Sequence, residues 1–319
     1  KLLNGKFYLL DRMGTKLLCF DRDGKFLKKF EARGNGPDEY FMLCFLAADP
    51  VSKKILVADD VVRKIFIFDE FLNLEHVVKV DFTPKQVIAF RDDMILRYEN
   101  DNKEQYQDSL LRDYDLHWID LKGDVVQGMI RNRTPKYGLS FLSASGYLDN
   151  GDILYYPTLG DTVYRVAVSE RTVSPAYIIE SGDEDVKLLN DEQRREMDPN
   201  AELPEYEKRN YFFPVEFFNV GSHILLRSGM DDMYLYSKNS GNAIRYDKTL
   251  ENMSGDRTFD YLTSIIYACD GDWCYGPHHA ITLQYMAKDY GFSGKYKAMI
   301  DSMETDANLF LACFKVKDF

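Results

Sequence analysis

The feature that most constrains the fold is an internal repeat. Asp11 is followed by RMGTKLLCF and then Asp21, and Asp59 is followed by DVVRKIFIF and then Asp69, so the two segments align without a gap. Self-similarity of this kind indicates a repeat architecture, in which each unit is one small supersecondary motif packed on its neighbours. The chain is therefore expected to consist of several copies of one small sheet.

Four further segments extend the repeat along the chain. Three keep its frame: DDMILRYEN (92–100) rejoined at LHWIDLKGD (116–124), DILYYPTLGDTVYRV (152–166) and HILLRSGMDDMYLY (223–236). A weaker sixth unit starts at DWCYGPHH and is rejoined near LFLACFKVK. The intervals between units differ because some units contain insertions.

Each unit is typical of four β-strands. In the second unit these are FMLCFLAAD, KILVAD, KIFIFD and LEHVVKV, joined by short turns. Four antiparallel strands per repeat are typical of a β-propeller blade. We therefore predict an all-β fold, a six-bladed β-propeller forming one domain over residues 1–319, with short helical insertions on one face. A β-sandwich would not require the same frame to return.

Length and charge exclude several classes. The 319 residues exceed the roughly 250 of a single ordinary core, which fits one large closed all-β unit or two ordinary domains. Lys and Arg number 40 against 52 Asp and Glu, a net charge of −12, and no basic run occurs, so nucleic acid is not expected as a partner. No apolar run approaches the roughly 18 residues that span a bilayer, and residues 1–20 lack a signal-peptide pattern.

The five cysteines form no CxxC pair and no regular metal-ligand spacing. Because their number is odd, at least one is unpaired within the chain. Cys19 and Cys313 lie inside apolar strand-like runs, where a cysteine acts as a small hydrophobic residue. Cys269 and Cys274 are close enough in sequence for a local disulfide, and the sequence leaves that alternative open.

The stretch RGNGPDEY (33–40) is either a phosphate-binding loop or a corner of the backbone. A dinucleotide loop would need a third glycine in place of Glu39 and a helix after it, whereas YFMLCFLAAD is typical of a strand. We predict that this stretch crosses from the outermost strand of one blade to the innermost strand of the next, with glycine and proline shaping the turn. No cofactor is expected.

The segment FDRDGKFLKKFEARGNGPDEY resembles the Phe-Asp-x-x-Gly-Lys-Phe…Gly-x-Gly-Pro-x-Glu-Tyr/Phe signature of a family of six-bladed β-propellers. These NHL-like proteins are common as predicted lipoproteins of Gram-negative gut anaerobes and are largely of unknown function. The resemblance covers nearly the whole chain and implies the fold, but it supplies no catalytic residues. It also implies a location in the periplasm or at the outer membrane, with membrane contact only through an N-terminal lipid anchor absent from this chain.

In that family, a strand pair before NGKFYLLD supplies the inner strand of the first blade and the outer strand of the last. This chain opens at KLLNG. The resemblance therefore predicts that the N-terminal closing strands are largely absent here. It also predicts that LFLACFKVK has an unpaired edge.

Three long insertions interrupt the repeat, at 99–115, 182–210 and 278–306. The first and third fall between the second and third strands of blades three and six, and the third contains two expected short helices, AITLQYMAKDY and KYKAMIDSMET. The second is a helix-like crossing from blade four to blade five. Because such turns and crossings point to the same side of antiparallel blades, all three are expected on one face, over an axial site.

The ends of the second strands identify the candidate ligand-binding residues, which are Arg12, Arg63, Tyr98, Arg227 and His278. Mixed charge with a tyrosine suits a polar ligand such as a glycan or a peptide, or a protein partner. Arg63 and Arg227 are equally explained as solvated rim charges. Asp11 and Asp59 lie nearby, and the favoured explanation is that they cap their own turns.

The resulting hypothesis is a non-catalytic, envelope-associated binding or scaffold propeller with no catalytic residue. The alternative is a metal-dependent hydrolase, lactonase or lyase that uses the axial channel. A calcium site built from Asp11 and Asp59 is compatible with carboxylate chemistry. The adjacent His278 and His279 would point to opposite sides of a strand, so they could both bind one metal ion only if that segment is a loop. No GxSxG or HExxH motif is present.

Overall fold

The computed structural model describes the chain except for residues 12–14, 85, 99–105, 132–143, 149, 158–159, 181–187, 197–213, 229–231, 248–255, 264, 290, 305–309 and 317–319. The chain forms two compact units, Lys1–Phe213 and Pro214–Phe319. Its six antiparallel sheets are the blades of a six-bladed β-propeller, so the predicted fold class is confirmed. Among the described residues, no helix has the length and apolar character needed to cross a membrane.

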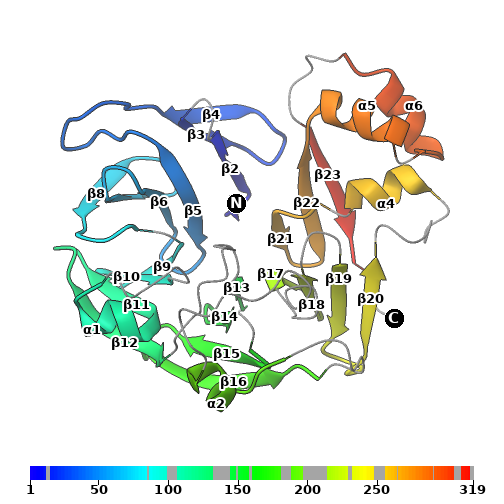
Figure 1. Cartoon of the computed structure of the whole chain (residues 1–319). Coiled ribbons are helices and arrows are strands. Elements are labelled where there is room, and N and C mark those ends of the chain that lie inside the picture. Colours follow the sequence, from blue (N-terminus) through cyan, green and yellow to red (C-terminus); the bar gives the residue numbers. More distant parts are fainter. Residues whose placement is uncertain are drawn as a thin grey trace. The chain divides into compact units, whose positions relative to one another are not determined.

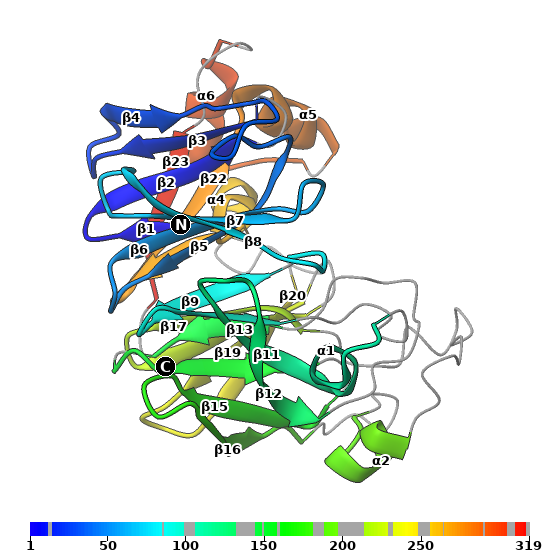
Figure 2. The ribbon, with the colours of Figure 1, turned by 90° about the vertical axis from the view of Figure 1, so that its left-hand side faces the viewer.

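Unit 1 contains four sheets, each with four strands in chain order (Figure 1). Figure 2 shows the strands of the first sheet lying one above another. A short helix lies between β10 and β11, and another follows β16. The bounds are β1 (Leu2–Leu3), β2 (Lys6–Asp11), β3 (Lys16–Phe20), β4 (Phe26–Phe30), β5 (Leu43–Asp49), β6 (Lys54–Asp59), β7 (Lys64–Phe68), β8 (Leu74–Lys79), β9 (Val87–Arg91), β10 (Met94–Tyr98), α1 (Ser109–Asp113), β11 (Tyr114–Asp120), β12 (Val125–Arg131), β13 (Ala144–Tyr147), β14 (Ile153–Tyr156), β15 (Thr162–Ala167), β16 (Thr172–Ile178) and α2 (Asp191–Glu196).

Unit 2 contains the fifth and sixth sheets and three described helices. Two of these helices, α5 and α6, are those predicted within 278–306, whereas α4 was not anticipated from the sequence. The bounds are β17 (Pro214–Val220), β18 (His223–Ser228), β19 (Asp232–Ser237), β20 (Ala243–Asp247), α4 (Arg257–Thr263), β21 (Ala268–Asp270), β22 (Trp273–His278), α5 (Ala280–Asp289), α6 (Lys295–Asp301) and β23 (Phe310–Lys315).

The core of unit 1 lies between neighbouring sheets. Strand β6 is buried on both sides: Ile55 and Val57 pack toward the first sheet, and Leu56 and Ala58 pack toward the third. This explains why KILVAD is a continuous apolar run, since both faces of a middle strand are covered. The outer strand β4 is exposed at four of its five positions, as expected for the rim of a blade.

The second aspartate of the repeat caps the turn between the third and fourth strands. In Asp21, Asp69 and Asp120, Oδ1 accepts hydrogen bonds of 2.8–3.0 Å from the backbone N–H groups two and four residues ahead. The turns also place Gly24 and Gly123 at positive φ, where glycine avoids a steric penalty. The DRDG and DLKG similarity is therefore a repeated side-chain-capped turn.

The first aspartate of the repeat joins a turn to a crossing. The Asp59 carboxylate is fully buried. Its Oδ1 accepts hydrogen bonds from the N–H groups of Val61 and Val62 at 2.9 and 3.1 Å. Its Oδ2 accepts hydrogen bonds from the N–H groups of Phe41 and Met42 at 2.6 and 2.9 Å. The turn-capping explanation is therefore confirmed for Asp59.

A second buried carboxylate joins the second and third blades at the opposite strand ends. Asp49 accepts hydrogen bonds from Val51 N–H at 3.0 Å and from Phe90 N–H at 2.8 Å. Its Oδ2 also forms a buried ion pair with Nη1 of Arg91. Asp49 thus links these two blades at this end of their strands.

The terminal strands differ between the first and last sheets. Strand β1 pairs with β2 through Leu2 and Leu3, so the first sheet has four strands. Strand β23 pairs with β22 over six residues, from Phe310 to Lys315. Within the described residues, no strand pairs with its other edge, as predicted for LFLACFKVK.

We expect Asp59→Ala to lower the free energy of unfolding by about 3 kcal/mol, because four backbone N–H groups would lose their acceptor at a buried site. Asp21→Ala is the matched control: its carboxylate caps an exposed turn, and we expect a loss of about 1 kcal/mol or less. Urea unfolding of both variants measures the difference. Equal losses of unfolding free energy in the two variants would contradict the role of Asp59 in joining the turn to the crossing.

Candidate functional site

In unit 1, the turns from second to third strands and the crossings between sheets lie at the same strand ends, which we call the crossing face. Val80 N–H donates to the carbonyl of Arg63 at 3.0 Å, which joins the crossing after β8 to the β6–β7 turn. Asp161 N–H donates to the carbonyl of Leu189 at 2.9 Å, which joins the β14–β15 turn to the crossing after β16. The common face predicted for these connections is thus present within unit 1.

The described parts of the three insertions also lie where the second strands of their own sheets end or where a crossing begins. Within 99–115, helix α1 lies beside β11, and Nε2 of His117 is 3.0 Å from the carbonyl oxygen of Leu110. Within 182–210, the part that includes α2 begins beside the β14–β15 turn. In unit 2, α5 and α6 follow the end of β22 and pack with α4. The other residues of these insertions lie outside the described part of the chain.

The RGNGPDEY stretch is a structural crossing between β4 and β5, as predicted. A side chain on Gly34 would overlap Oε2 of Glu39, and one on Gly36 would lie 3.0 Å from it. That Oε2 accepts a hydrogen bond from Gly36 N–H at 2.7 Å. Nζ of Lys64 donates to the carbonyl oxygens of Gly36, Pro37 and Glu39 at 2.7–3.0 Å. The glycines therefore accommodate a carboxylate of the loop itself.

The end of this stretch presents an aromatic ring to solvent. Tyr40 is buried, and its hydroxyl donates to the carbonyl of Thr15 at 2.5 Å and accepts from Ala32 N–H at 3.2 Å. Phe41 is the next residue, and its side chain is 46% exposed. The guanidinium carbon of Arg33 lies 5.4 Å from the centre of the Phe41 ring. The crossing face thus carries an exposed arginine–phenylalanine pair.

The backbone beneath this pair is fixed. The Asp59 carboxylate binds the N–H groups of both Phe41 and Val61, so the two residues are neighbours on the crossing face. Val61 is also exposed. Together, Arg33, Phe41 and Val61 form a small amphipathic surface, which we call the blade-two patch. Sequence reasoning missed it, although strict alternation after the buried Tyr40 would have placed Phe41 outward.

Of the predicted site residues in unit 1, Arg63 lies nearest this patch in sequence. It is exposed, and Nη1 donates to the carbonyl of Asp81 at 3.1 Å. Its φ of 55° matches the 50° of Thr15 at the equivalent turn position, so this left-handed backbone belongs to the repeated turn. Arg12 lies outside the described residues.

Tyr98 lies at the end of β10 and is buried. Its hydroxyl hydrogen-bonds Oε1 of Gln86, and its backbone N–H donates to the carbonyl of the same residue at 3.2 Å. Its ring packs edge-on against Tyr155, with centroids 5.7 Å apart. These contacts place the Tyr98 side chain in the core between the third and fourth sheets.

Arg227 and His278 belong to unit 2. Arg227 lies on β18, opposite Met233 of β19, and is partly exposed. His278 is buried at the end of β22, with Nε2 3.1 Å from the carbonyl oxygen of Leu262 and its ring stacked on Phe310. Burial lowers the pKa of His278 below its ordinary value of 6.5. The buried His278 ring thus contacts helix α4 through the Leu262 carbonyl and strand β23 through Phe310.

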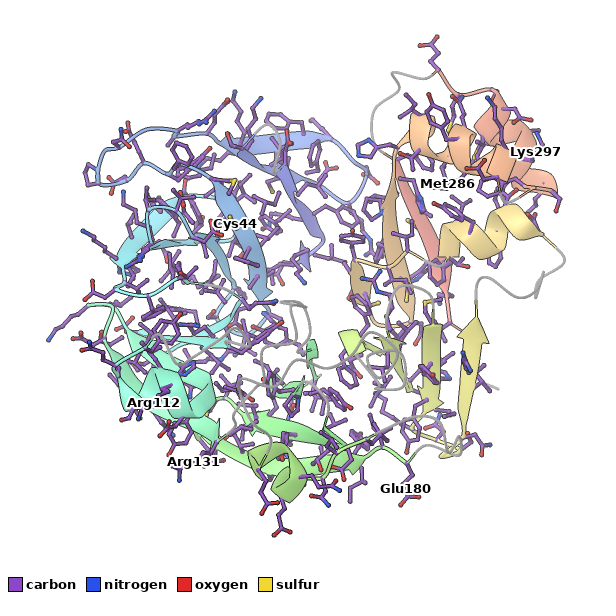
Figure 3. The ribbon with its side chains drawn as sticks, in the orientation of Figure 1. Cys44, Arg112, Arg131, Glu180, Met286 and Lys297 are labelled. Carbon is purple, nitrogen blue, oxygen red and sulfur yellow. The ribbon has the colours of Figure 1, made fainter. Side chains whose placement is uncertain are left out.

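The helices of unit 2 form a platform, defined as α4, α5 and α6, with its own core of Leu262, Leu283, Phe292 and Ile300. One carboxylate serves two of these helices: Asp256 Oδ1 accepts hydrogen bonds from Thr258 and Phe259 N–H at the start of α4, and Oδ2 accepts one from Lys295 N–H at the start of α6. Figure 3 shows Lys297 of α6 at the surface of this platform.

Within the described ranges, no group of three or more His, Cys, Asp and Glu side chains could hold a metal ion. Both oxygens of Asp59, one of the two carboxylates considered for calcium, are occupied by backbone N–H donors. The blade-two patch offers aromatic stacking together with guanidinium hydrogen bonding.

The Gly34–Glu39 contact gives a test of the crossing. We expect Gly34→Ala to lower the free energy of unfolding by about 1–2 kcal/mol, because the new methyl group pushes the Glu39 carboxylate off Gly36 N–H. In a Glu39→Ala background the same change should cost less than about 0.5 kcal/mol, because that carboxylate is gone. Additive losses in this double-mutant cycle would show that the glycine is needed for another reason.

The chain resembles many solved structures, among them the following three. A protein from Bacteroides fragilis named "Putative exported protein" has a TM-score of 0.72 and 18% identity, over 99% of this chain and 89% of that one, and so shares its fold. Virginiamycin B lyase from Staphylococcus aureus has a TM-score of 0.46 and 11% identity, over 85% and 73% of the two chains. A member of the DUF4221 family from Bacteroides vulgatus has the same score and identity, over 76% and 78%.

No curated protein matches the sequence. The family described as "Domain of unknown function (DUF4934)" matches residues 1–315, nearly the whole chain. The repeat, the glycine-rich crossing and the six sheets described above all fall within that range. The chain therefore belongs to the DUF4934 family of β-propeller proteins.

Proposed function

We propose that this protein is a non-catalytic binding propeller, which recognises a polar ligand such as a glycan or a peptide, or a protein partner, through its crossing face. The observation that carries the proposal is the exposed Arg33–Phe41 pair of the blade-two patch. Aromatic residues and arginine are enriched where proteins bind partners, and they supply most of the binding energy there.

The chemistry of the pair suits a ligand with both apolar and polar faces. The Phe41 ring offers a flat surface for stacking, and the Arg33 guanidinium offers a planar set of donors for carbonyl, carboxylate or hydroxyl oxygens. Because Asp59 and Tyr40 hold the backbone on either side of the pair, little backbone conformational entropy is lost when a ligand binds.

Arg63 adds a second exposed guanidinium on the crossing face of the same blade, and we include it in the proposed site. The proposal gives Tyr98 and His278 supporting roles, because both side chains are buried. Arg12 and Arg227 stay predictions for ligand binding.

We also propose a location in the cell envelope, supported by the family resemblance of the sequence and by the name of the Bacteroides fragilis relative. Fractionation of cells that express the full-length gene from its native start tests this location. Recovery of the protein in the periplasmic or outer-membrane fraction is expected. Recovery in the cytosol would contradict it.

Binding is tested by screening the labelled protein against printed glycans and immobilised peptides, and then measuring the affinity of variants for the probes that bind. We expect Phe41→Ala and Arg33→Ala to weaken binding at least about tenfold, because each removes part of a stacking surface. Their melting temperatures should stay within about 2 °C of the unsubstituted protein, because both side chains are exposed.

The matched control is Phe71→Ala. Phe71 is also an exposed phenylalanine under a cation, with Nζ of Lys6 4.6 Å from its ring centre. It lies in the β7–β8 turn, at the strand ends opposite the crossing face. Unchanged binding by Phe71→Ala together with weakened binding by Phe41→Ala supports the proposal. Equal effects, or undiminished binding by Phe41→Ala, would overturn the assignment of the site.

A further inference from the structure

The sixth sheet brings two cysteines together. Strands β21 and β22 form a hairpin in which Cys269 is the register partner of Cys274. The next pair, Asp270 and Trp273, flanks a two-residue turn whose first residue, Gly271, has a φ of 55°. Glycine at that position is typical of tight hairpin turns.

The geometry of this hairpin suits a covalent link. In a two-residue hairpin the pair beside the turn exchanges backbone hydrogen bonds, so the following pair is a non-hydrogen-bonded pair with Cα atoms about 4.5 Å apart. That spacing lies within the range of about 4.4–6.8 Å that a disulfide spans. The two side chains lie on the same face of the sheet, and the Sγ atoms of Cys269 and Cys274 are 3.2 Å apart.

We propose that Cys269 and Cys274 form a disulfide that fastens β21, the inner strand of the sixth sheet, to β22. The two S–H bonds break and one S–S bond forms, with release of two protons and two electrons. The oxidant is a small-molecule or protein disulfide, such as oxidised glutathione, which accepts the two electrons as its own S–S bond breaks and leaves as two thiols.

The surroundings of the pair favour a stable link. Cys274 is fully buried and Cys269 is half-buried, in a core that includes Val220, Leu225 and Ile266. An external thiol can therefore reach only the Cys269 sulfur in the folded protein, which slows reduction. Strand β21 has three residues, against seven in β17, so a cross-link supports an inner strand that has few ladder hydrogen bonds of its own.

The other cysteines do not compete with this pairing. Cys313 is the register partner of Tyr275 on β22, so it lies on the opposite face of the sheet from Cys274. Cys313 is exposed, so it serves as a reference cysteine within the same chain, one that is expected to stay reduced. Cys19 and Cys44 are buried among the strands of unit 1.

Mass spectrometry tests the link directly. The full chain is equilibrated with a mixture of oxidised and reduced glutathione, denatured in N-ethylmaleimide and digested with trypsin. Cys269 and Cys274 lie in one tryptic peptide, residues 258–288, which contains no other cysteine. We expect this peptide to carry no adduct and to be about 2 Da lighter than its dithiol form, whereas Cys313 carries one adduct.

The same peptide with two maleimide adducts, or with glutathione bound to either cysteine, would overturn the proposal. The structural effect is tested by comparing melting temperatures before and after reduction. We expect reduction to lower the melting temperature of the parent chain by about 3 °C or more, and to lower that of Cys313→Ala by the same amount. Reduction should leave the melting temperature of Cys269→Ala unchanged. An unchanged melting temperature for the reduced parent chain would overturn the claim that the link fastens β21.

Discussion

The structure of unit 1 depends on a buried carboxylate that binds two chain segments at once. Asp59 ends the second strand of its blade and accepts hydrogen bonds from four backbone N–H groups, two in the following turn and two at the entry of β5. Without this buried carboxylate, these partly buried amides would lose their acceptor. One side chain thus sets both the turn within the blade and the path by which the chain enters it.

This constraint also shapes the surface available for binding. Because Asp59 holds the backbone at Phe41 and Val61, and Tyr40 is anchored below, the backbone that carries the exposed Phe41 ring is held in place on the crossing face. At the opposite strand ends, the Asp49–Arg91 ion pair joins the same blade to the next. The blade-two patch therefore rests on a blade that is held at both ends, which favours a preformed binding surface.

The sequence predicted the blades, the glycine-rich crossing and the helices α5 and α6, because their signals are local: aspartates at fixed spacing, alternation and helical period. Tyr98 and His278 were placed at a ligand-facing position, yet both are buried, because alternation shows the side to which a residue points but not what covers it. Asp256 illustrates the same limit: it caps α4 and also binds Lys295 N–H, a contact across 39 residues that no local pattern reveals.

Hydrogen exchange at the backbone amides tests the central claim most directly. If the Asp59 carboxylate holds turn and crossing together, the amides of Phe41, Met42, Val61 and Val62 should exchange as slowly as those of the buried strand β6, although they lie outside the strand ladder. In Asp59→Ala, all four should exchange faster together, because both carboxylate oxygens that accept from them are lost. Fast exchange of these amides in the unsubstituted protein would contradict the account.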